Sequence, residues 1–170
     1  KPEDESFTID LSIVGDCMLA TYKGGYYKGS FNWYAANKDP SYFLEKVKPV
    51  FEADDFTIAN LETVLTDRKL TETPKKSERA FWFKGPASNA KILTSGSVEA
   101  VSLANNHTGD YGEAGRKDTI AAVEAAGLKY GNNDNTFVVE KNGFKIAVIC
   151  HGLWSEGQTG EIIPRIKKWS

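Results

Sequence analysis

The sequence predicts an α/β fold in which a layered sheet is flanked by helices. Short apolar runs that end at glycine or at a polar side chain alternate along the chain with segments of helical spacing. This order is typical of a parallel sheet whose strands are joined by helices. Polar clusters also follow several of these runs directly, and ligand sites in such sheets form where the strands end.

The first strand is predicted from alternation. Apolar and polar side chains alternate over residues 7–13 and lead into Val14-Gly15-Asp16. Asp16 is therefore expected at a strand end. Residues 21–38 are rich in Tyr, Gly, Asn and Lys without a clear period, and we expect a long loop there.

A helix is predicted from Asp39 to Phe51. Asp39 has the character of an N-cap, and Pro40 suits the first helical position. Apolar residues then recur at helical spacing, namely Phe43, Val47, Val50 and Phe51. One face of this helix is expected to pack against the rest of the domain.

The next strand is predicted over residues 56–59. If the extended chain continues, Asn60 and Glu62 lie on the same side of it. Residues 63–79 are polar and mixed in charge, and we expect an exposed excursion before the aromatic run 81–83.

The following elements lead to the richest motif of the chain. Residues 86–95 are predicted as a short helix closed by Gly96, and residues 98–104 as a strand. The strand ends at Asn105-Asn106-His107, which sets an amide oxygen beside an acid/base imidazole.

Two further elements complete the expected domain. Asp110 and Glu113 fit a capping box for a helix that ends at Gly127. Asn142-Gly143, between two apolar runs, is a strong hairpin signal.

Composition limits the classes of function. With 170 residues and 41% hydrophobic content, residues 1–170 can form one domain with a substantial core. The 21 basic and 23 acidic residues give a net charge of −2 and a pI of about 5.8, so nucleic acid is not an expected partner. No apolar run reaches the roughly 18 residues that cross a bilayer.

The two cysteines, Cys17 and Cys150, each end an apolar run. They are compatible with two buried thiols or with one disulfide, and two cysteines do not form a disulfide scaffold. We expect buried thiols.

Three polar clusters are predicted to share one pocket. Asp16, the pair Asn60 and Glu62, and Asn105-Asn106-His107 all follow predicted strands. Oxygen, amide and imidazole groups together suit divalent metals. We therefore expect the side chains of these clusters to converge at the carboxyl edge of the sheet.

Several motifs carry a resemblance to a known family. They are Gly15 to Leu19, Asn60-Leu61-Glu62, Phe81 to Pro86, Ser102 to His107, Asp110-Tyr111-Gly112 with Gly115, Ala126-Gly127 and Gly131. In this order they resemble the CapA-type poly-γ-glutamate capsule biosynthesis proteins, and they span most of the chain.

The resemblance implies a calcineurin-like, metallophosphatase-like fold, of which residues 1–170 would be the N-terminal part. It also implies an extracytoplasmic protein associated with the membrane through a segment outside this sequence. The implied partners are capsule-synthesis membrane proteins or poly-γ-glutamate, and the implied cofactor is a divalent metal such as Mn, Zn, Mg or Fe.

Roles carry over from the family residue by residue. The resemblance implies His107 as the catalytic residue, either an acid/base or a phosphate-facing imidazole, and Asn105 as a substrate-binding residue. As metal ligands it implies Asp16, Asn60, Glu62 and Asn106. One departure is that the metallophosphatase superfamily has a histidine two residues after its first aspartate, where this chain has Met18. His151, the other histidine, follows a strand end and is interpreted as a structural residue.

Two functions follow as alternatives. The protein is a component of poly-γ-glutamate synthesis or export that binds polymer or partner subunits, or it is a metal-dependent hydrolase of a phosphoester or an amide-linked polymer. The near-neutral charge, with only small basic clusters at Lys75-Lys76-Arg79 and Lys167-Lys168, argues against tight polyanion binding by this chain alone. Ligand counting predicts weak metal binding without phosphoesterase turnover.

Overall fold

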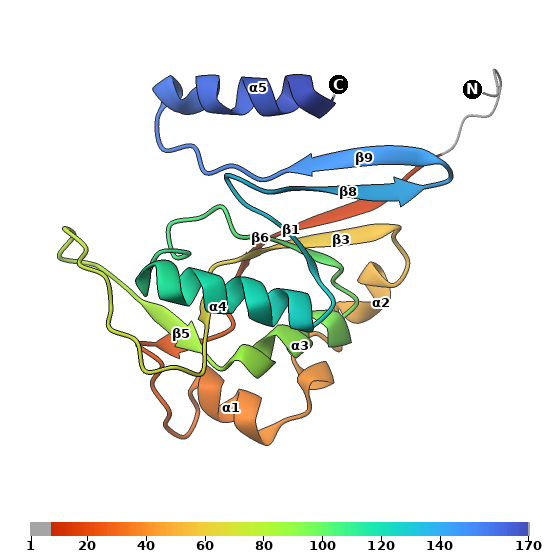
Figure 1. Cartoon of the computed structure of the whole chain (residues 1–170). Coiled ribbons are helices and arrows are strands. Elements are labelled where there is room, and N and C mark those ends of the chain that lie inside the picture. Colours follow the sequence, from red (N-terminus) through yellow and green to blue (C-terminus); the bar gives the residue numbers. More distant parts are fainter. Residues whose placement is uncertain (1–7, 170) are drawn as a thin grey trace, which may run out of the picture.

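The computed structural model describes residues 8–169 and places four parallel strands in one sheet (Figure 1). In sheet order the strands are β1 (Leu11–Cys17), β3 (Phe56–Leu61), β6 (Ala100–Ser102) and β7 (Lys129–Gly131). Each neighbouring pair runs parallel, and helical segments connect successive strands. The predicted α/β class is confirmed.

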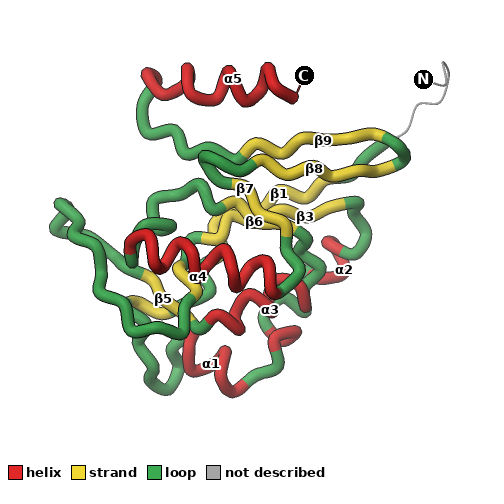
Figure 2. Tube along the Cα trace, in the orientation of Figure 1, coloured by secondary structure: helices red, strands yellow, loops and turns green. Residues whose placement is uncertain are grey.

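Helices cover one face of this sheet, and a hairpin covers the other (Figure 2). The helical face packs on α3 (Ala90–Ser95) and α4 (Gly112–Ala125), with Ala59 and Leu61 of β3 in the main core. The hairpin joins β8 (Thr136–Lys141) to β9 (Phe144–Ile149). Because side chains alternate along β3, Phe56 and Ile58 belong to a second core beneath the hairpin.

The turn of the hairpin confirms the Asn-Gly signal. Asn142 and Gly143 both have positive φ, at 52° and 78°, as a two-residue turn between antiparallel strands requires. The hairpin leaves part of β1 uncovered, and Ile13 remains 74% exposed. The alternation therefore predicted the strand correctly but not the burial of its apolar side chains; Phe7 lies outside the described residues.

A second, three-stranded sheet lies beyond the ends of the main strands. Its strands, in order, are β2 (Thr21–Tyr22), β5 (Phe83–Gly85) and β4 (Val64–Leu65). Val64 and Leu65 are completely buried, so the prediction of an exposed segment is wrong at its start. The reason is that β4 pairs with β5, and the two strands are distant in sequence.

The prediction of a loop over residues 21–38 is also wrong, because it contains β2 and α1 (Phe31–Asn37). The N-cap of α1 is Ser30, whose hydroxyl accepts a hydrogen bond from the backbone N–H of Trp33. The sequence of α1 contains aromatic residues and no periodic aliphatic pattern, so it does not indicate a helix.

The predicted helix 39–51 is broken into two pieces. Asp39 does act as a cap, but of a 3₁₀ helix, Pro40–Tyr42, and α2 spans only Lys48–Phe51. Pro49 has no backbone N–H to donate and so begins a helix more readily than it continues one. Val50 is 61% exposed, so the expected apolar face does not form.

The remaining helical segments lie at the two sides of the sheet. The 3₁₀ helix Ala87–Asn89 precedes α3, and the 3₁₀ helix Glu156–Gln158 precedes α5 (Thr159–Trp169). The helix predicted over residues 86–95 is confirmed in this two-part form. No helix within residues 8–169 has the length and apolar character to cross a bilayer.

Both cysteines are free thiols, as predicted, and they pack in different cores. Cys17 contacts the main core on the helical face, and Cys150 belongs to the core beneath the hairpin. Burial raises the pKa of Cys17 to about 11 and also raises the pKa of Cys150. Each thiol is therefore protonated at neutral pH.

We expect both thiols to react slowly with thiol reagents in the folded protein. At pH 8 the thiolate fraction of Cys17 is small, since its thiolate forms only as the pH rises towards 11, and the thiolate is the reactive species. Titration with Ellman's reagent is expected to be roughly 100-fold slower than for an exposed cysteine. Unfolding in guanidinium should release two reactive thiols. Fewer than two would indicate a disulfide and contradict the prediction.

Candidate functional site

A bulge in β1 sets the first polar side chain of the site. Val14 pairs with Ala59 but Asp16 pairs with Asn60, so Gly15 is an extra residue in the register. This extra residue turns Asp16 to the same side as Asn60 and away from the helical core. Without it, Asp16 would lie beside Leu61, which is 1% exposed.

The ends of β1 and β3 together form an acidic cluster, which we define as Asp16, Asn60 and Glu62. The side-chain Nδ2 of Asn60 donates to Asp16 Oδ1 at 2.9 Å and lies 3.4 Å from Glu62 Oε1. Asn60 thus presents its amide N–H groups to both carboxylates. The predicted juxtaposition of Asn60 and Glu62 on one side of the chain agrees with this geometry.

Asn105 connects the acidic cluster to the turn after β6. Its Nδ2 donates to Asn60 Oδ1 and to the Leu61 carbonyl, each at 3.0 Å. Its Oδ1 accepts from the backbone N–H groups of His107 and Thr108. Both ends of the Asn105 side chain are therefore engaged within the protein, and they hold the Asn-Asn-His turn against β3.

His107 is paired with a completely buried carboxylate. Its Nδ1 lies 2.9 Å from Asp110 Oδ2, which also accepts from the backbone N–H of Phe83 at 2.9 Å. The other oxygen, Oδ1, forms an ion pair with Lys75 Nζ. A carboxylate acceptor favours a proton on Nδ1, which leaves Nε2 as the free nitrogen of the ring.

The role of Asp110 differs from the predicted capping box. The N-cap of α4 is Tyr111, whose side chain makes no capping bond, and Glu113 is exposed. The Asp110 carboxylate points back to His107 and Lys75 because an ion pair compensates its burial there. The sequence analysis related Asp110 to Glu113 and not to His107, although the spacing of three residues between His107 and Asp110 allows the contact.

A segment between β4 and β5 folds over this turn, and we call residues 67–82 the strap. Thr73 donates through its backbone N–H to the Asp110 carbonyl at 2.9 Å, and through its hydroxyl to the Gly109 carbonyl at 2.9 Å. Trp82 Nε1 donates to the Thr73 carbonyl at 2.7 Å. These bonds hold the strap beside His107.

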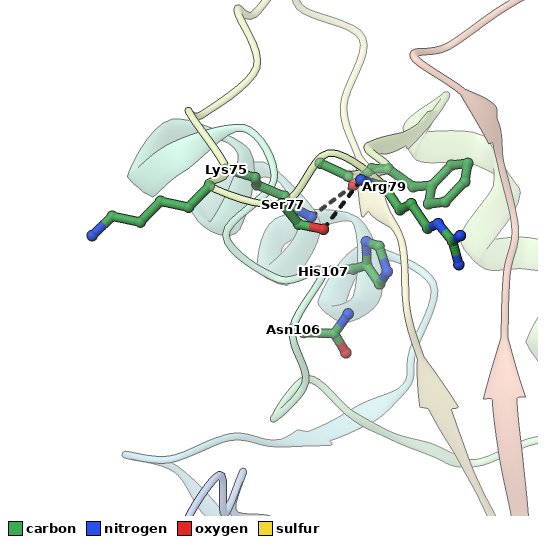
Figure 3. Close-up of a pocket in the computed structure, with 8 residues that line it drawn as sticks. Lys75, Ser77, Arg79, Asn106 and His107 are labelled. Atoms are coloured by element: carbon green, nitrogen blue, oxygen red, sulfur yellow. Dashed lines mark hydrogen bonds between the residues drawn. The ribbon is translucent and has the colours of Figure 1, made fainter.

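The strap and the turn line an open pocket of about 480 Å³ (Figure 3). We call it the strap pocket; its lining residues are Lys75, Lys76, Ser77, Arg79, Ala80, Phe81, Asn106 and His107. Three of them are cationic and none is acidic. The basic cluster of the sequence therefore faces a defined hollow rather than a featureless surface.

The predicted site residues form two adjoining groups. Asp16, Asn60 and Glu62 make the acidic cluster, whereas Asn106 and His107 line the strap pocket. Asn105 joins the two groups. The sequence analysis placed all of these residues at strand ends, but it did not anticipate that Lys75 and Asp110 complete the second group.

His151 lies apart from both groups. Its Nε2 is 3.3 Å from Glu161 Oε2, and its Nδ1 is 3.4 Å from the guanidinium of Arg165. Arg165 also donates to the carbonyls of Asn133, Asn135 and Cys150. His151 therefore helps to dock α5, in keeping with its interpretation as a structural residue.

Comparison with known proteins assigns this architecture to a family. The profile of the bacterial capsule synthesis protein family PGA_cap matches residues 10–161, which include every strand of the main sheet. The chain belongs to this family. The assignment agrees with the metallophosphatase-like fold that the sequence motifs imply.

Two relatives carry names that refer to capsule synthesis. The capsule biosynthesis protein CapA of Bacillus anthracis is 30% identical over 142 residues, covering 82% of this chain and 31% of the relative. The PGA biosynthesis protein CapA of Bacillus subtilis (strain 168) is 26% identical over 122 residues, covering 70% of this chain and 29% of the relative. The chain thus spans about three-tenths of the length of these relatives.

For this member of the capsule synthesis family, the acidic cluster does not fit a complete metal centre. It contains two carboxylates, and the amide nitrogen of Asn60, rather than its oxygen, faces them. Within residues 8–169 no three His, Cys, Asp or Glu side chains are grouped so that they could hold a metal ion. We therefore assign no chemical step to a metal, and the hydrolase alternative gains no support from this donor set.

We expect divalent metal to bind the chain weakly. Two carboxylates give few ligands, and turning the Asn60 amide would break its bond to Asn105. Calorimetric titration with Mn²⁺ should give a dissociation constant of about 0.1 mM or weaker. Asp134→Asn, which alters an exposed carboxylate elsewhere, is the matched control. Micromolar binding that disappears only in Asp16→Asn would contradict the prediction.

Proposed function

We propose that the protein is a component of poly-γ-glutamate capsule biosynthesis or export. The observation that carries this proposal is the match to the capsule synthesis family over residues 10–161, which includes both groups of the site. The name of the Bacillus subtilis relative, a PGA biosynthesis protein, supports the choice of polymer. We further propose that it acts at the extracytoplasmic side of the membrane, with capsule-synthesis membrane proteins as partners.

The site supports handling of the polymer by binding. Poly-γ-glutamate offers a carboxylate and an amide in each repeat. The strap pocket provides cationic and hydrogen-bonding groups, and His107 is held in one orientation by Asp110. Such a site can position an anionic chain without forming a covalent bond to it.

Capsule production in the native host tests this proposal. Deletion of the gene is expected to reduce cell-associated polymer by at least about tenfold, and the wild-type gene should restore it. The polymer is quantified by acid hydrolysis and glutamate analysis. A matched pair of complementing variants is His107→Ala in the site and Lys91→Ala on the exposed side of α3. Unchanged polymer in the deletion strain would overturn the proposal.

A further inference from the structure

Contacts within the strap fix the shape of the strap pocket. Lys75 Nζ donates to the Phe81 carbonyl at 2.7 Å across the strap and also pairs with Asp110 beneath it. The backbone N–H of Arg79 donates to Ser77 Oγ at 3.2 Å. These contacts, two of which are drawn as dashed lines in Figure 3, fix the curvature of the strap. A ligand therefore meets a preorganised surface, which lowers the entropic cost of binding.

The three cationic side chains of the pocket differ in whether a carboxylate already pairs with them. Asp110 compensates the charge of Lys75. Lys76 and Arg79 are exposed, and within residues 8–169 neither has a carboxylate partner. Two positive charges thus remain at the pocket although the whole chain carries −2. Local charge therefore matters here more than the net charge used in the sequence analysis.

The other lining groups define the shape of a suitable anion. Ser77 Oγ accepts from Arg79, so its hydroxyl proton is free to donate, and Asn106 brings an exposed amide. Phe81, 54% exposed, adds an apolar wall. A carboxylate on a short methylene chain matches this combination, because a guanidinium binds a carboxylate with two parallel bonds while the ring contacts the methylenes.

We propose that the strap pocket is a carboxylate-binding site for one glutamyl unit of the polymer, with Arg79 and Lys76 as the binding residues. The proposal rests on the proposed function for the identity of the polymer. It places recognition on the strap, and not on the acidic cluster, whose carboxylates would repel the same ligand.

Calorimetric titration of the protein with a short γ-linked glutamate oligomer tests the assignment. Arg79→Ala and Lys76→Ala are each expected to weaken binding by about tenfold, since each removes a charged hydrogen-bond donor. Lys91→Ala should bind like the wild type. The oligomer with methyl-esterified carboxylates should not bind. Circular dichroism before each titration confirms that the exposed substitutions leave the fold intact.

Three results would overturn the assignment: no binding of the oligomer by the wild type, equal binding by Arg79→Ala, Lys76→Ala and Lys91→Ala, or stronger binding of inorganic phosphate than of the oligomer. None of these results depends on capsule production in the host. A chain that supports capsule formation without binding the oligomer would refute the pocket assignment alone. An unchanged capsule after gene deletion would instead refute the proposed function.

Discussion

Replacement of Asp110 by asparagine is expected to lower the free energy of unfolding by about 3–5 kcal/mol. The carboxylate is completely buried and accepts from His107 Nδ1 and from the Phe83 N–H, while it pairs with Lys75. An asparagine in the same place must turn its NH₂ group towards one of these donors. It also leaves the Lys75 ammonium without a counter-charge, and removal of one partner of a buried pair is strongly destabilising.

Urea unfolding followed by tryptophan fluorescence measures this loss. The control is Glu113→Gln, which removes a carboxylate that is exposed in the first turn of α4 and should change stability by less than about 0.5 kcal/mol. The double variant with Lys75→Met should recover part of the loss, because the uncompensated ammonium is gone. Trypsin should also cleave the strap of Asp110→Asn faster. A loss below about 1 kcal/mol would refute the importance of this buried pair.

Local patterns were sufficient to predict most of the strands of the main sheet. The apolar runs before Asp16, Asn60 and Asn105 form β1, β3 and β6, and the Asn-Gly turn forms the predicted hairpin. The runs of β3 and β6 are apolar along their length because both faces of these strands are largely buried. β1 is only partly covered, and alternation of apolar and polar side chains indicated it instead. The polar residues that follow these strands could therefore be located at one edge of the sheet before the structure was known.

The sequence could not show how these polar residues divide between two groups. The bulge at Gly15 changes which side Asp16 faces, and alternation alone does not reveal an extra residue. The ion pair between Lys75 and Asp110 joins two segments that α3 and β6 separate in the sequence. Contacts of this kind depend on tertiary packing, which a pattern within a short window does not encode.

Short elements with aromatic or proline residues were also beyond local prediction. In α1 the residues that pack are Phe31, Asn32 and Ala35, and α2 forms only the last part of the predicted helix, with Pro49 in its first turn. Both segments lie below the length at which helix periodicity is informative. Phe31 and Ala35 of α1 and Phe51 of α2 contact the main core, and this tertiary packing supports both segments.

Replacement of Asn105 by alanine is expected to lower the free energy of unfolding by about 2–4 kcal/mol. The side chain donates to Asn60 Oδ1 and to the Leu61 carbonyl, and its Oδ1 accepts from the backbone N–H groups of His107 and Thr108. Alanine leaves these partly buried groups without partners, and each unpaired buried group costs about 1–3 kcal/mol. Water reaching the turn offsets part of this cost.

The neighbouring amide provides a matched control for this prediction. Asn106 is exposed, so Asn106→Ala should change stability by less than about 0.5 kcal/mol. Asn105→Asp keeps the acceptor for His107 and Thr108 but loses both donated bonds and adds a charge near Glu62, so an intermediate loss is expected. Chemical denaturation ranks the three variants. If Asn105→Ala and Asn106→Ala were equally stable, Asn105 would not be the residue that holds the turn against β3, and its amide would be available to a ligand instead.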